Sequence, residues 1–176
     1  MLKKIAIIGP ESTGKSVLTE QVANHFHCPW NPEYAREYLL TIKRKYTYDD
    51  LLIIAKKQWE LTEQKAEAAR QHGCKVMFTD TEMYIMKVWC EVVFGKCHSW
   101  ITDKINEQQF DLYLLCKPDI PWVKDELREY PDLEMRVTLF NTYKHLMENQ
   151  NKPWVEIGGN YDDRFSAALK AVEAVL

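Results

Sequence analysis

A glycine-rich stretch near the start of the chain, Gly9-Pro10-Glu11-Ser12-Thr13-Gly14-Lys15-Ser16, carries residue types at a spacing that binds phosphate. It fits the pattern G-x-x-x-x-G-K-[ST] at every fixed position. The two glycines let the backbone bend so that successive N–H groups point inward at a phosphate. The lysine can reach the outer phosphates of a nucleotide, and the last serine can coordinate Mg²⁺. The candidate phosphate-binding residues are Gly9, Glu11, Ser12, Thr13, Gly14, Lys15, Ser16 and Val17.

The surroundings of this loop distinguish it from a coincidental glycine turn. An apolar run over 3–8 precedes it and reads as a buried strand, and a helical pattern over 16–26 follows. The positive N-terminal end of that helix would add to the attraction for an anion. The N-K-x-D base-reading loop of guanine-specific switch proteins does not occur. The sequence therefore predicts binding of a nucleoside triphosphate and favours ATP, together with Mg²⁺.

A carboxylate at the end of a second predicted strand is the next candidate. Asp80 follows the apolar run 76–79 and stands two residues before a helical pattern. It could hold the magnesium shell through water, or accept the proton of a hydroxyl that attacks the γ-phosphate. Capping of the helix by Thr79, Asp80 or Thr81 is the alternative, and both interpretations can hold at once. Glu82 is a weaker candidate of the same kind.

Two clusters of aromatic and charged residues flank the expected crevice. The first, "CPWNPEYAREY", contains Trp30, Glu33, Tyr34 and Arg36, and the second, "PDIPWVKDELREYPD", contains Trp122. Aromatic faces could clamp a flat ring, above all a positively charged one, and acidic neighbours would help. Core packing is the alternative. It is preferred for the tryptophans at 59, 89 and 154, whereas binding and packing stay open for those at 30 and 122.

The segment 117–132, called the lid segment below, contains three prolines and many charges. This composition predicts a mobile segment. Arg128, within it, and Arg136, just beyond it, are candidates for guanidinium groups that a lid brings onto a transferring phosphate. A solvated, charged loop is the alternative.

Strands and helices alternate along the chain. Strands are expected over 3–8, 76–79, 112–116 and 155–157, and helices over 16–26, 35–44, 48–71, 82–94, 133–148 and 161–175. Such alternation predicts an α/β protein of the P-loop NTPase fold, with a parallel sheet of about five strands flanked by helices. Ligands of these sheets bind beyond the carboxyl ends of the strands. The informative loops are therefore those after Ile8, Thr79, Cys116 and Ile157.

The bulk composition narrows the class of protein. The 176 residues suit one domain, 1–176, and 46% of them are hydrophobic, enough for a sizeable core. A net charge of -3 without a long basic run argues against a nucleic-acid binder. The first apolar run is too short for a signal peptide or a membrane span, so we expect no membrane partner and a cytoplasmic location. Five cysteines without a C-x-x-C pair argue against a disulfide framework or a structural zinc site.

Several stretches together resemble a known family. They are "IAIIGPESTGKS", "PWNPEYAREY", "FTDTE", "KVWCEVVFGKC" and "LYLLCKPDIPWVKDELREYPD". The chain from about Lys4 to Arg164 resembles the ribosylnicotinamide kinase domain of NadR-type NAD-biosynthesis proteins. The resemblance implies ATP-dependent phosphorylation of the 5′-hydroxyl of nicotinamide riboside to nicotinamide mononucleotide. It also implies Asp80 at the ribose and metal, and Arg128 in the lid. The residues Trp30, Glu33, Tyr34 and Arg36 match the substrate-side motif.

One departure from that family bears on function. No H-x-G-H nucleotidyltransferase motif appears and two residues precede Lys3, so we expect no second step to NAD and no repressor role. Two rival functions remain. One is a kinase of the same fold that acts on another nucleoside or small alcohol, and the other is a regulatory P-loop ATPase that is not a kinase. The sequence leaves the oligomeric state open.

Overall fold

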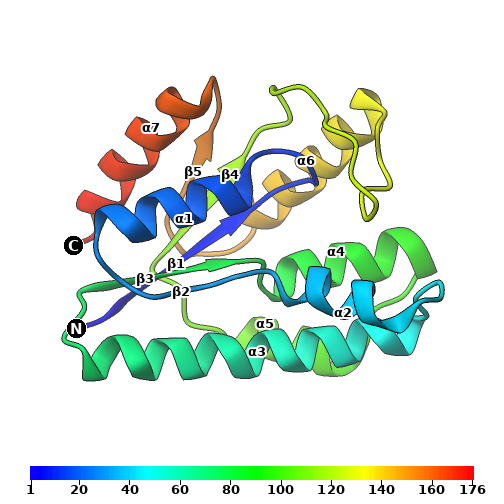
Figure 1. The fold of residues 1–176 in the computed structure, drawn as a ribbon, viewed down its shortest axis with the longest axis horizontal. Helices are drawn as coiled ribbons and strands as arrows, with labels where there is room; N and C mark the ends of the chain where they lie inside the picture. The colour runs from blue at the N-terminus through cyan, green and yellow to red at the C-terminus, as the bar shows by residue number, and fades with distance from the viewer.

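A five-stranded sheet in the order β2-β3-β1-β4-β5 forms the centre of the molecule (Figure 1). All neighbouring strands run parallel. The structure is a computed structural model that describes residues 1–176. Because β1 lies in the middle and the chain moves to opposite sides of it, the carboxyl end of β1 is the switch point where ligands of such sheets bind.

The strands are β1 (Lys3–Ile8), β2 (Trp30–Asn31), β3 (Val76–Asp80), β4 (Leu112–Cys116) and β5 (Trp154–Ile157). The helices are α1 (Lys15–His25), α2 (Tyr34–Ile42), α3 (Tyr48–Gln71), α4 (Met83–Phe94), α5 (Ser99–Glu107), α6 (Leu133–Glu148) and α7 (Tyr161–Glu173).

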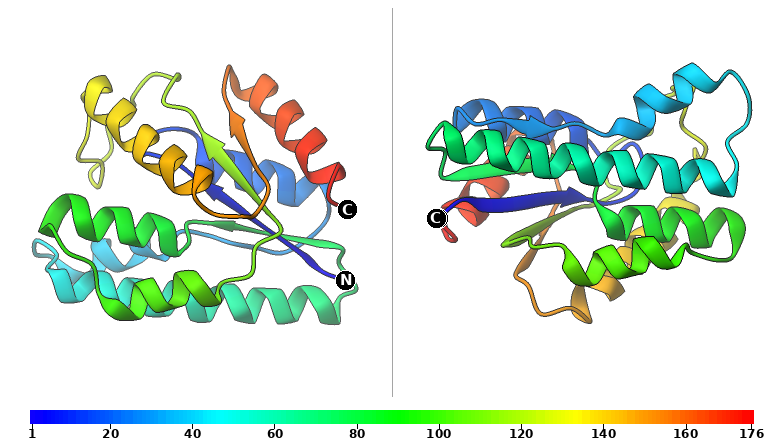
Figure 2. Two further views of the ribbon diagram at one scale, coloured as in Figure 1. Left: turned by 180° about the vertical axis from the view of Figure 1, so that it is seen from behind. Right: turned by 90° about the horizontal axis from the view of Figure 1, so that it is seen from below.

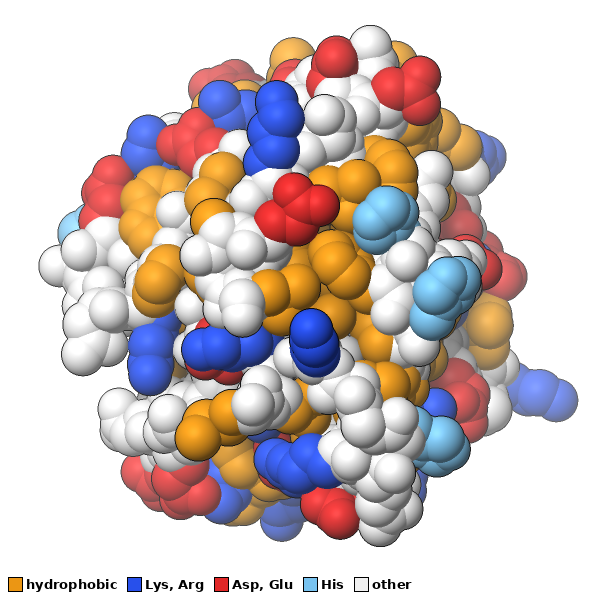
Figure 3. Space-filling model, turned by 90° about the vertical axis from the view of Figure 1, so that its left-hand side faces the viewer, with side chains coloured by type: hydrophobic (Ala, Val, Ile, Leu, Met, Phe, Trp, Pro, Cys, Tyr) orange, Lys and Arg blue, Asp and Glu red, His pale blue; other side chains and the backbone are white.

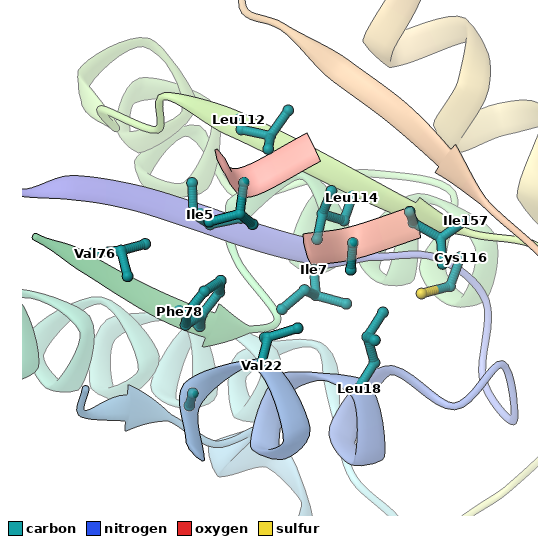
Figure 4. Packing of buried hydrophobic residues seen from close by; sticks show 13 residues of the cluster. Ile5, Ile7, Leu18, Val22, Val76, Phe78, Leu112, Leu114, Cys116 and Ile157 are labelled. Atoms are coloured by element: carbon teal, nitrogen blue, oxygen red, sulfur yellow. The ribbon is translucent and has the colours of Figure 1, made fainter. Parts of the chain in front are cut away.

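Helices cover both faces of the sheet, and the alternation of side chains along β1 explains how. Ile5 and Ile7 point to one face, where they pack with α1 and α7 in a buried cluster. Figure 4 shows Leu18 and Val22 of α1 turned toward this side of the sheet. Ala6 and Ile8 point to the other face, toward α4 and α6. The helix α3 packs on that second face as well, and Figure 2 shows it running alongside the sheet.

The α/β fold with an all-parallel sheet flanked by helices confirms the predicted fold class. The predicted elements are all present, with ends that differ by one or two residues, and the lid segment contains no helix or strand. Two elements were not predicted. The strand β2 has only two residues between prolines, and it pairs with β3 through Trp30 and Asn31. The buried Asn31 side chain also donates to the Thr62 hydroxyl at 2.8 Å. The helix α5 is short, with nine residues, and buries only Ile101.

The surface seen in Figure 3 mixes Lys and Arg side chains with Asp and Glu, and apolar atoms lie between them. None of the helices is long and apolar enough to cross a membrane.

Candidate active site

The phosphate loop leaves the carboxyl end of β1 and turns directly into α1. Gly9 has a φ of 138°, and a Cβ at this position would lie 2.7 Å from the carbonyl oxygen of Cys116. Gly14 has a φ of 76° and forms the N-cap of α1. Both backbones therefore require glycine, since a side chain would strain the loop or collide with β4. The glycines of the motif are explained by the geometry of the loop.

Polar contacts inside the loop set its shape. The Thr13 hydroxyl and the Lys15 ammonium both donate to the Pro10 carbonyl, each at 2.8 Å. From the opposite side, the guanidinium of Arg164 donates to the Thr13 carbonyl at 2.9 Å and to the Lys117 carbonyl at 3.0 Å. Arg164 is buried in α7 and is a support of the loop that the sequence did not reveal, because a lone arginine in an amphipathic helix reads as a surface residue.

Asp80 lies beside the loop at the end of β3. Its register partner in β1 is Ile7, two residues before Gly9, so the sheet itself brings the carboxylate to the switch point. The Asp80 side chain is buried, and its Oδ2 accepts a hydrogen bond from the Ser16 hydroxyl at 2.5 Å. Burial raises the pKa of Asp80, while the Lys15 ammonium and the Ser16 hydrogen bond oppose that rise. Burial has the larger effect, so the pKa of Asp80 is raised overall.

The structure shows which residue caps α4. The N-cap of α4 is Glu82, whose carboxylate accepts hydrogen bonds from the backbone N–H groups of Tyr84 and Ile85. The prediction that Thr79, Asp80 or Thr81 caps this helix was therefore wrong, and Glu82 caps it instead. Burial raises the pKa of Glu82 to about 7.

Asp80 also provides a test of whether the residues fit a magnesium ion. Its Oδ1 is buried and has no hydrogen-bond partner, and its other oxygen is already bonded to the Ser16 hydroxyl. A carboxylate oxygen and a serine hydroxyl are hard oxygen donors of the kind that Mg²⁺ takes in nucleotide sites. The pair fits the ion, and Ser16 and Asp80 would hold it.

A cavity of about 450 Å³ extends from the phosphate loop toward α2 and α4. All the predicted phosphate-loop residues line it. So do the candidates Trp30, Glu33, Arg36, Asp80 and Arg128. Three candidates do not: Tyr34, Trp122 and Arg136. The structure thus brings most of the candidate residues to one space and excludes three of them.

Glu33 is a further carboxylate of the cavity. It precedes α2, and no hydrogen bond holds its side chain. Its burial and the negative charge of Asp80 raise the pKa of Glu33 to about 7, against the attraction of Lys15 and Arg36. Asp80 and Glu33 therefore face the same space as the carboxylates of Glu11 and Glu129, and the negative charges of Asp80 and Glu11 raise the pKa of Glu33.

The three excluded candidates have other contacts. Tyr34 packs with the cluster around Leu51 and Ile54, and its ring lies 6.1 Å from that of Tyr38. The Trp122 indole donates to the Glu11 carboxylate at 3.1 Å. Arg136 is buried within α6, and its Nε and Nη1 have no hydrogen-bond partner.

Aromatic residues that the sequence did not single out line the far end of the cavity. Tyr46 and Trp89 meet there with ring centroids 5.2 Å apart in an edge-to-face arrangement. The Trp89 indole donates to the Tyr46 hydroxyl at 3.0 Å, and that hydroxyl donates to the Glu129 carboxylate at 2.8 Å. Trp89 also packs against the core, as expected, but its ring reaches the cavity. Tyr46 lies several residues after the first aromatic cluster, so only the fold shows that it lines the cavity.

Gln58 links the two carboxylates through the backbone. Its Nε2 donates to the carbonyls of Asp80 and Pro32, at 3.1 and 3.2 Å, and its Oε1 accepts from the Tyr34 N–H at 2.8 Å. Pro32 and Tyr34 are the neighbours of Glu33 in the chain, and Asp80 is the last residue of β3. Gln58 is buried in α3, and its helical pattern gave no sign of this role.

Thr81, the residue after Asp80, lies in the left-handed region with a φ of 79° and is buried. This conformation is an outlier for a β-branched residue and costs of the order of 1–3 kcal/mol. The strained turn follows the buried Asp80 directly, next to the cavity.

The lid segment is tied to the acceptor side of the cavity by an ion pair. The guanidinium of Arg36 donates to both oxygens of Asp125, at 3.2 and 2.8 Å. This contact lowers the pKa of Asp125. Arg128 lines the cavity, and its Nη1 donates to the Val123 carbonyl within the segment.

The parallel sheet, the phosphate loop and the carboxylate beside it define a P-loop nucleotide-binding protein with the fold of nucleoside and nucleotide kinases. Residues 4–164 match the model of the family described as "AAA domain", and the chain belongs to this P-loop family. The resemblance to NadR proteins is confirmed by relatives that match almost the whole chain.

These relatives are named "Trifunctional NAD biosynthesis/regulator protein NadR". The protein of Escherichia coli (strain K12) is 30% identical over 181 residues, which cover 99% of this chain and 42% of the relative. The protein of Salmonella typhimurium is 27% identical and covers 99% of this chain and 43% of its own length. The chain thus spans less than half the length of these two relatives.

Solved structures show the same fold. A structure described as "Crystal structure of NadR protein in complex with NR" superposes with a TM-score of 0.82 at 21% identity, over 98% of this chain and 51% of that one. A thymidylate kinase from Ehrlichia chaffeensis superposes with a TM-score of 0.66 at 13% identity, over 99% of both chains.

Proposed function

We propose that this protein is an ATP-dependent kinase that phosphorylates the 5′-hydroxyl of nicotinamide riboside to nicotinamide mononucleotide. The observation that carries the proposal is one cavity in which a phosphate loop faces the carboxylates of Asp80 and Glu33 and an aromatic corner. Such a space can hold an alcohol next to a triphosphate. The relatives named for NAD biosynthesis, and a similar structure described as a complex with NR, support this choice of alcohol.

The far end of the cavity suits the ring of this substrate. The pyridinium of nicotinamide riboside is flat and carries a positive charge. The aromatic faces of Tyr46 and Trp89, with the Glu129 carboxylate bonded to Tyr46, offer π surfaces and negative charge to such a ring. Trp30 lines the cavity as well, whereas Trp122 is turned to Glu11 and is dropped from the ring site.

The reaction itself is a displacement at phosphorus. The 5′-oxygen forms a bond to the γ-phosphorus, the bond from that phosphorus to the β–γ bridging oxygen breaks, and ADP leaves. Lys15 and the N–H groups of the loop stabilise the negative charge on the transferred group. Bound Mg²⁺ would neutralise phosphate charge, with Ser16 and Asp80 as its protein groups.

Two carboxylates could accept the proton that the hydroxyl loses. The hydrogen bond to Ser16 ties Asp80 to the magnesium side of the cavity. Glu33 has no such tie, lines the cavity from the acceptor side, and has a pKa of about 7, close to the value that suits a general base at neutral pH. We therefore assign proton acceptance to Glu33 and metal binding to Asp80.

The test is a coupled assay for ADP with Mg-ATP and a panel of acceptors: nicotinamide riboside, nicotinic acid riboside, uridine, cytidine and thymidine. We expect turnover of nicotinamide riboside with nicotinamide mononucleotide as the product, identified by mass spectrometry. Lys15→Ala is the inactive control, since loss of a preorganised charge costs about 10²-fold or more in turnover.

Two other outcomes would replace the proposal. Efficient turnover of another nucleoside, with none of nicotinamide riboside, would make the protein a kinase for that acceptor. Slow ATP hydrolysis that no acceptor stimulates would favour a regulatory P-loop ATPase.

A further inference from the structure

The carboxylate of Glu11 is bound to the lid segment. Its Oε1 accepts hydrogen bonds from the Trp122 indole at 3.1 Å and from the Tyr130 N–H at 2.7 Å, and its Oε2 accepts from the Glu129 N–H at 2.9 Å. Glu11 stands at a position of the phosphate-loop motif that any residue can occupy. The motif therefore gives no reason for a glutamate, whereas these three contacts do.

The next residue of the loop makes a contact of the same kind. The Ser12 hydroxyl oxygen accepts from the Val123 N–H at 3.1 Å. Two consecutive residues of the phosphate loop thus hold the lid segment at both ends of the stretch from 122 to 130. Arg128 lies within that stretch and lines the cavity, and its Nη1 is bonded to the Val123 carbonyl.

The stretch from 122 to 130 also contacts Arg36 and Tyr46, which line the part of the cavity where the acceptor would bind. Asp125 pairs with Arg36 of α2, and the Glu129 carboxylate accepts from the Tyr46 hydroxyl. The Arg36 side chain is 53% exposed, so this ion pair is worth little in water. The charge-assisted hydrogen bonds to Glu11 are the stronger attachment, because three donors share one carboxylate.

We propose that Glu11 is a positioning residue that couples the phosphate loop to the lid segment and so sets the place of Arg128 over the cavity. Any movement of the loop that shifts the Glu11 carboxylate is passed to the backbone at Glu129 and Tyr130, on the C-terminal side of Arg128. The part of the inference that concerns Arg128 in phosphoryl transfer rests on the proposed function. The coupling of loop and lid does not.

Glu11→Gln isolates the carboxylate, since the side chain keeps its size. A glutamine has one acceptor oxygen and an NH₂ group that cannot accept from an N–H. At least one of the three donors is then left without its partner, and the charge is lost. Glu20→Gln is the matched control, because Glu20 is an exposed residue of α1 to which the structure assigns no hydrogen bond or ion pair.

The first measurement is limited trypsin digestion of the full chain, with and without Mg-AMP-PNP, followed by mass spectrometry of the fragments. Cleavage after Lys124 and Arg128 reports on the lid segment, and cleavage within α3 reports on global unfolding. In the wild type, we expect slow cleavage in the lid segment and further protection by the nucleotide. In Glu11→Gln, we expect cleavage there to be about tenfold faster and protection to be lost, with α3 cleaved at the rate of the control. Equal cleavage of the lid segment in Glu11→Gln and the wild type would overturn the coupling.

The second measurement is a double-mutant cycle on turnover with Glu11→Gln and Arg128→Ala. If Glu11 acts through Arg128, the double variant is about as slow as Arg128→Ala alone. Effects that multiply would mean that Glu11 does not act through Arg128. The digestion needs no acceptor substrate. A protein that fails to phosphorylate nicotinamide riboside but shows the digestion pattern would refute the proposed function and leave the coupling standing.

Discussion

The Ser16 hydroxyl donates a hydrogen bond to the Asp80 carboxylate over 2.5 Å, and this contact joins the first residues of α1 to the end of β3. The two residues are 64 positions apart in the sequence, and the pairing of β1 with β3 brings them together. Serine and aspartate on one side of a phosphate loop form the oxygen set that holds magnesium in P-loop proteins. The Glu33 carboxylate of the same cavity makes no such contact and is free for another task.

Asp80→Asn tests the metal side of this arrangement. The amide keeps the shape of the side chain and loses the charge that balances Mg²⁺. We expect kcat to fall about 10²-fold or more, with a higher Mg²⁺ concentration needed for half-maximal rate. Thermal stability should hold or rise, since burial raises the pKa of Asp80 and the charged form is costly in the fold. A variant that loses stability and keeps its kcat would show that Asp80 has only a structural role.

Glu33→Gln tests the assignment of the general base through the pH profile. The pKa of Glu33 lies near 7, so the wild-type rate should rise with pH as the carboxylate loses its proton and level off above about pH 7. Removal of a general base costs about 10² to 10⁴ in rate. In Glu33→Gln, we expect the residual rate to lose this ascending limb.

The dependence of kcat/KM on pH between 5.5 and 9 measures this ascending limb. Glu20→Gln is the control, because it makes the same Glu-to-Gln change at an exposed residue of α1. An unchanged ascending limb in Glu33→Gln would transfer the role of base to Asp80.

The phosphate loop and Asp80 could be predicted from the sequence because their signals are local. The loop is a fixed spacing of glycine, lysine and serine, and Asp80 ends a short apolar run. The all-parallel sheet followed from the alternation of strands and helices. The signal for each of these features is carried by residues that are neighbours in the chain.

The residues that the sequence missed are those whose roles depend on distant partners. Gln58 lies within a regular helix, yet it binds the backbone on both sides of the cavity. Arg164 supports a loop about 150 residues away, and Tyr46 lines the cavity beside Trp89 of α4. For Trp122 the sequence left ring binding and packing open, and in the structure its indole is bonded to Glu11. Contacts of this kind are set by tertiary packing, which residue spacing does not reveal.

Asp50→Asn tests how the acceptor side of the fold is held. Asp50 is buried at the start of α3, where its carboxylate forms a capping box with Thr47 and accepts from Tyr38 and Arg44. These hydrogen bonds, that from Arg44 first, hold the pKa of Asp50 well below its usual range. A depressed pKa means that the charged group stabilises the fold above its unfolded value of 3.8 and that this stability is lost as the pH falls below it.

We therefore expect the wild type to lose part of its free energy of unfolding as the pH is lowered from about 4 and Asp50→Asn to lose less over the same range. At pH 7, the variant should be less stable by about 0.5–2 kcal/mol, the usual cost of a helix cap. Urea denaturation at a series of pH values measures both effects. An equal slope against pH in the two proteins would mean that the carboxylate of Asp50 has no special partner in the folded state.

Arg128→Ala tests the guanidinium of the lid segment. Arg128 lines the cavity between the phosphate loop and α4, where negative charge spreads over the transferred group. We expect kcat to fall much more than the affinity for ATP, and Arg128→Lys to restore only part of the rate, since a point charge lacks the planar fork of a guanidinium. Steady-state kinetics gives kcat, and calorimetry gives the affinity. An unchanged kcat in Arg128→Ala would leave this residue as a solvated part of the loop.

Arg136 is the second arginine that the sequence suggested for the lid, and its variants test whether it acts on the phosphate as Arg128 is expected to do. Its side chain is buried in α6 outside the cavity, and two of its nitrogens have no hydrogen-bond partner. A buried charge without a partner destabilises a fold, and an apolar residue of similar volume in its place is often neutral or stabilising. Arg136→Met should therefore unfold at the same or a higher temperature, with kcat and KM within about twofold of the wild type. Arg136→Ala is the paired variant, and the cavity that it creates should lower the melting temperature without a selective loss of kcat. A fall in kcat of about tenfold or more in Arg136→Met, at unchanged stability, would instead place this guanidinium among the groups that act on the phosphate.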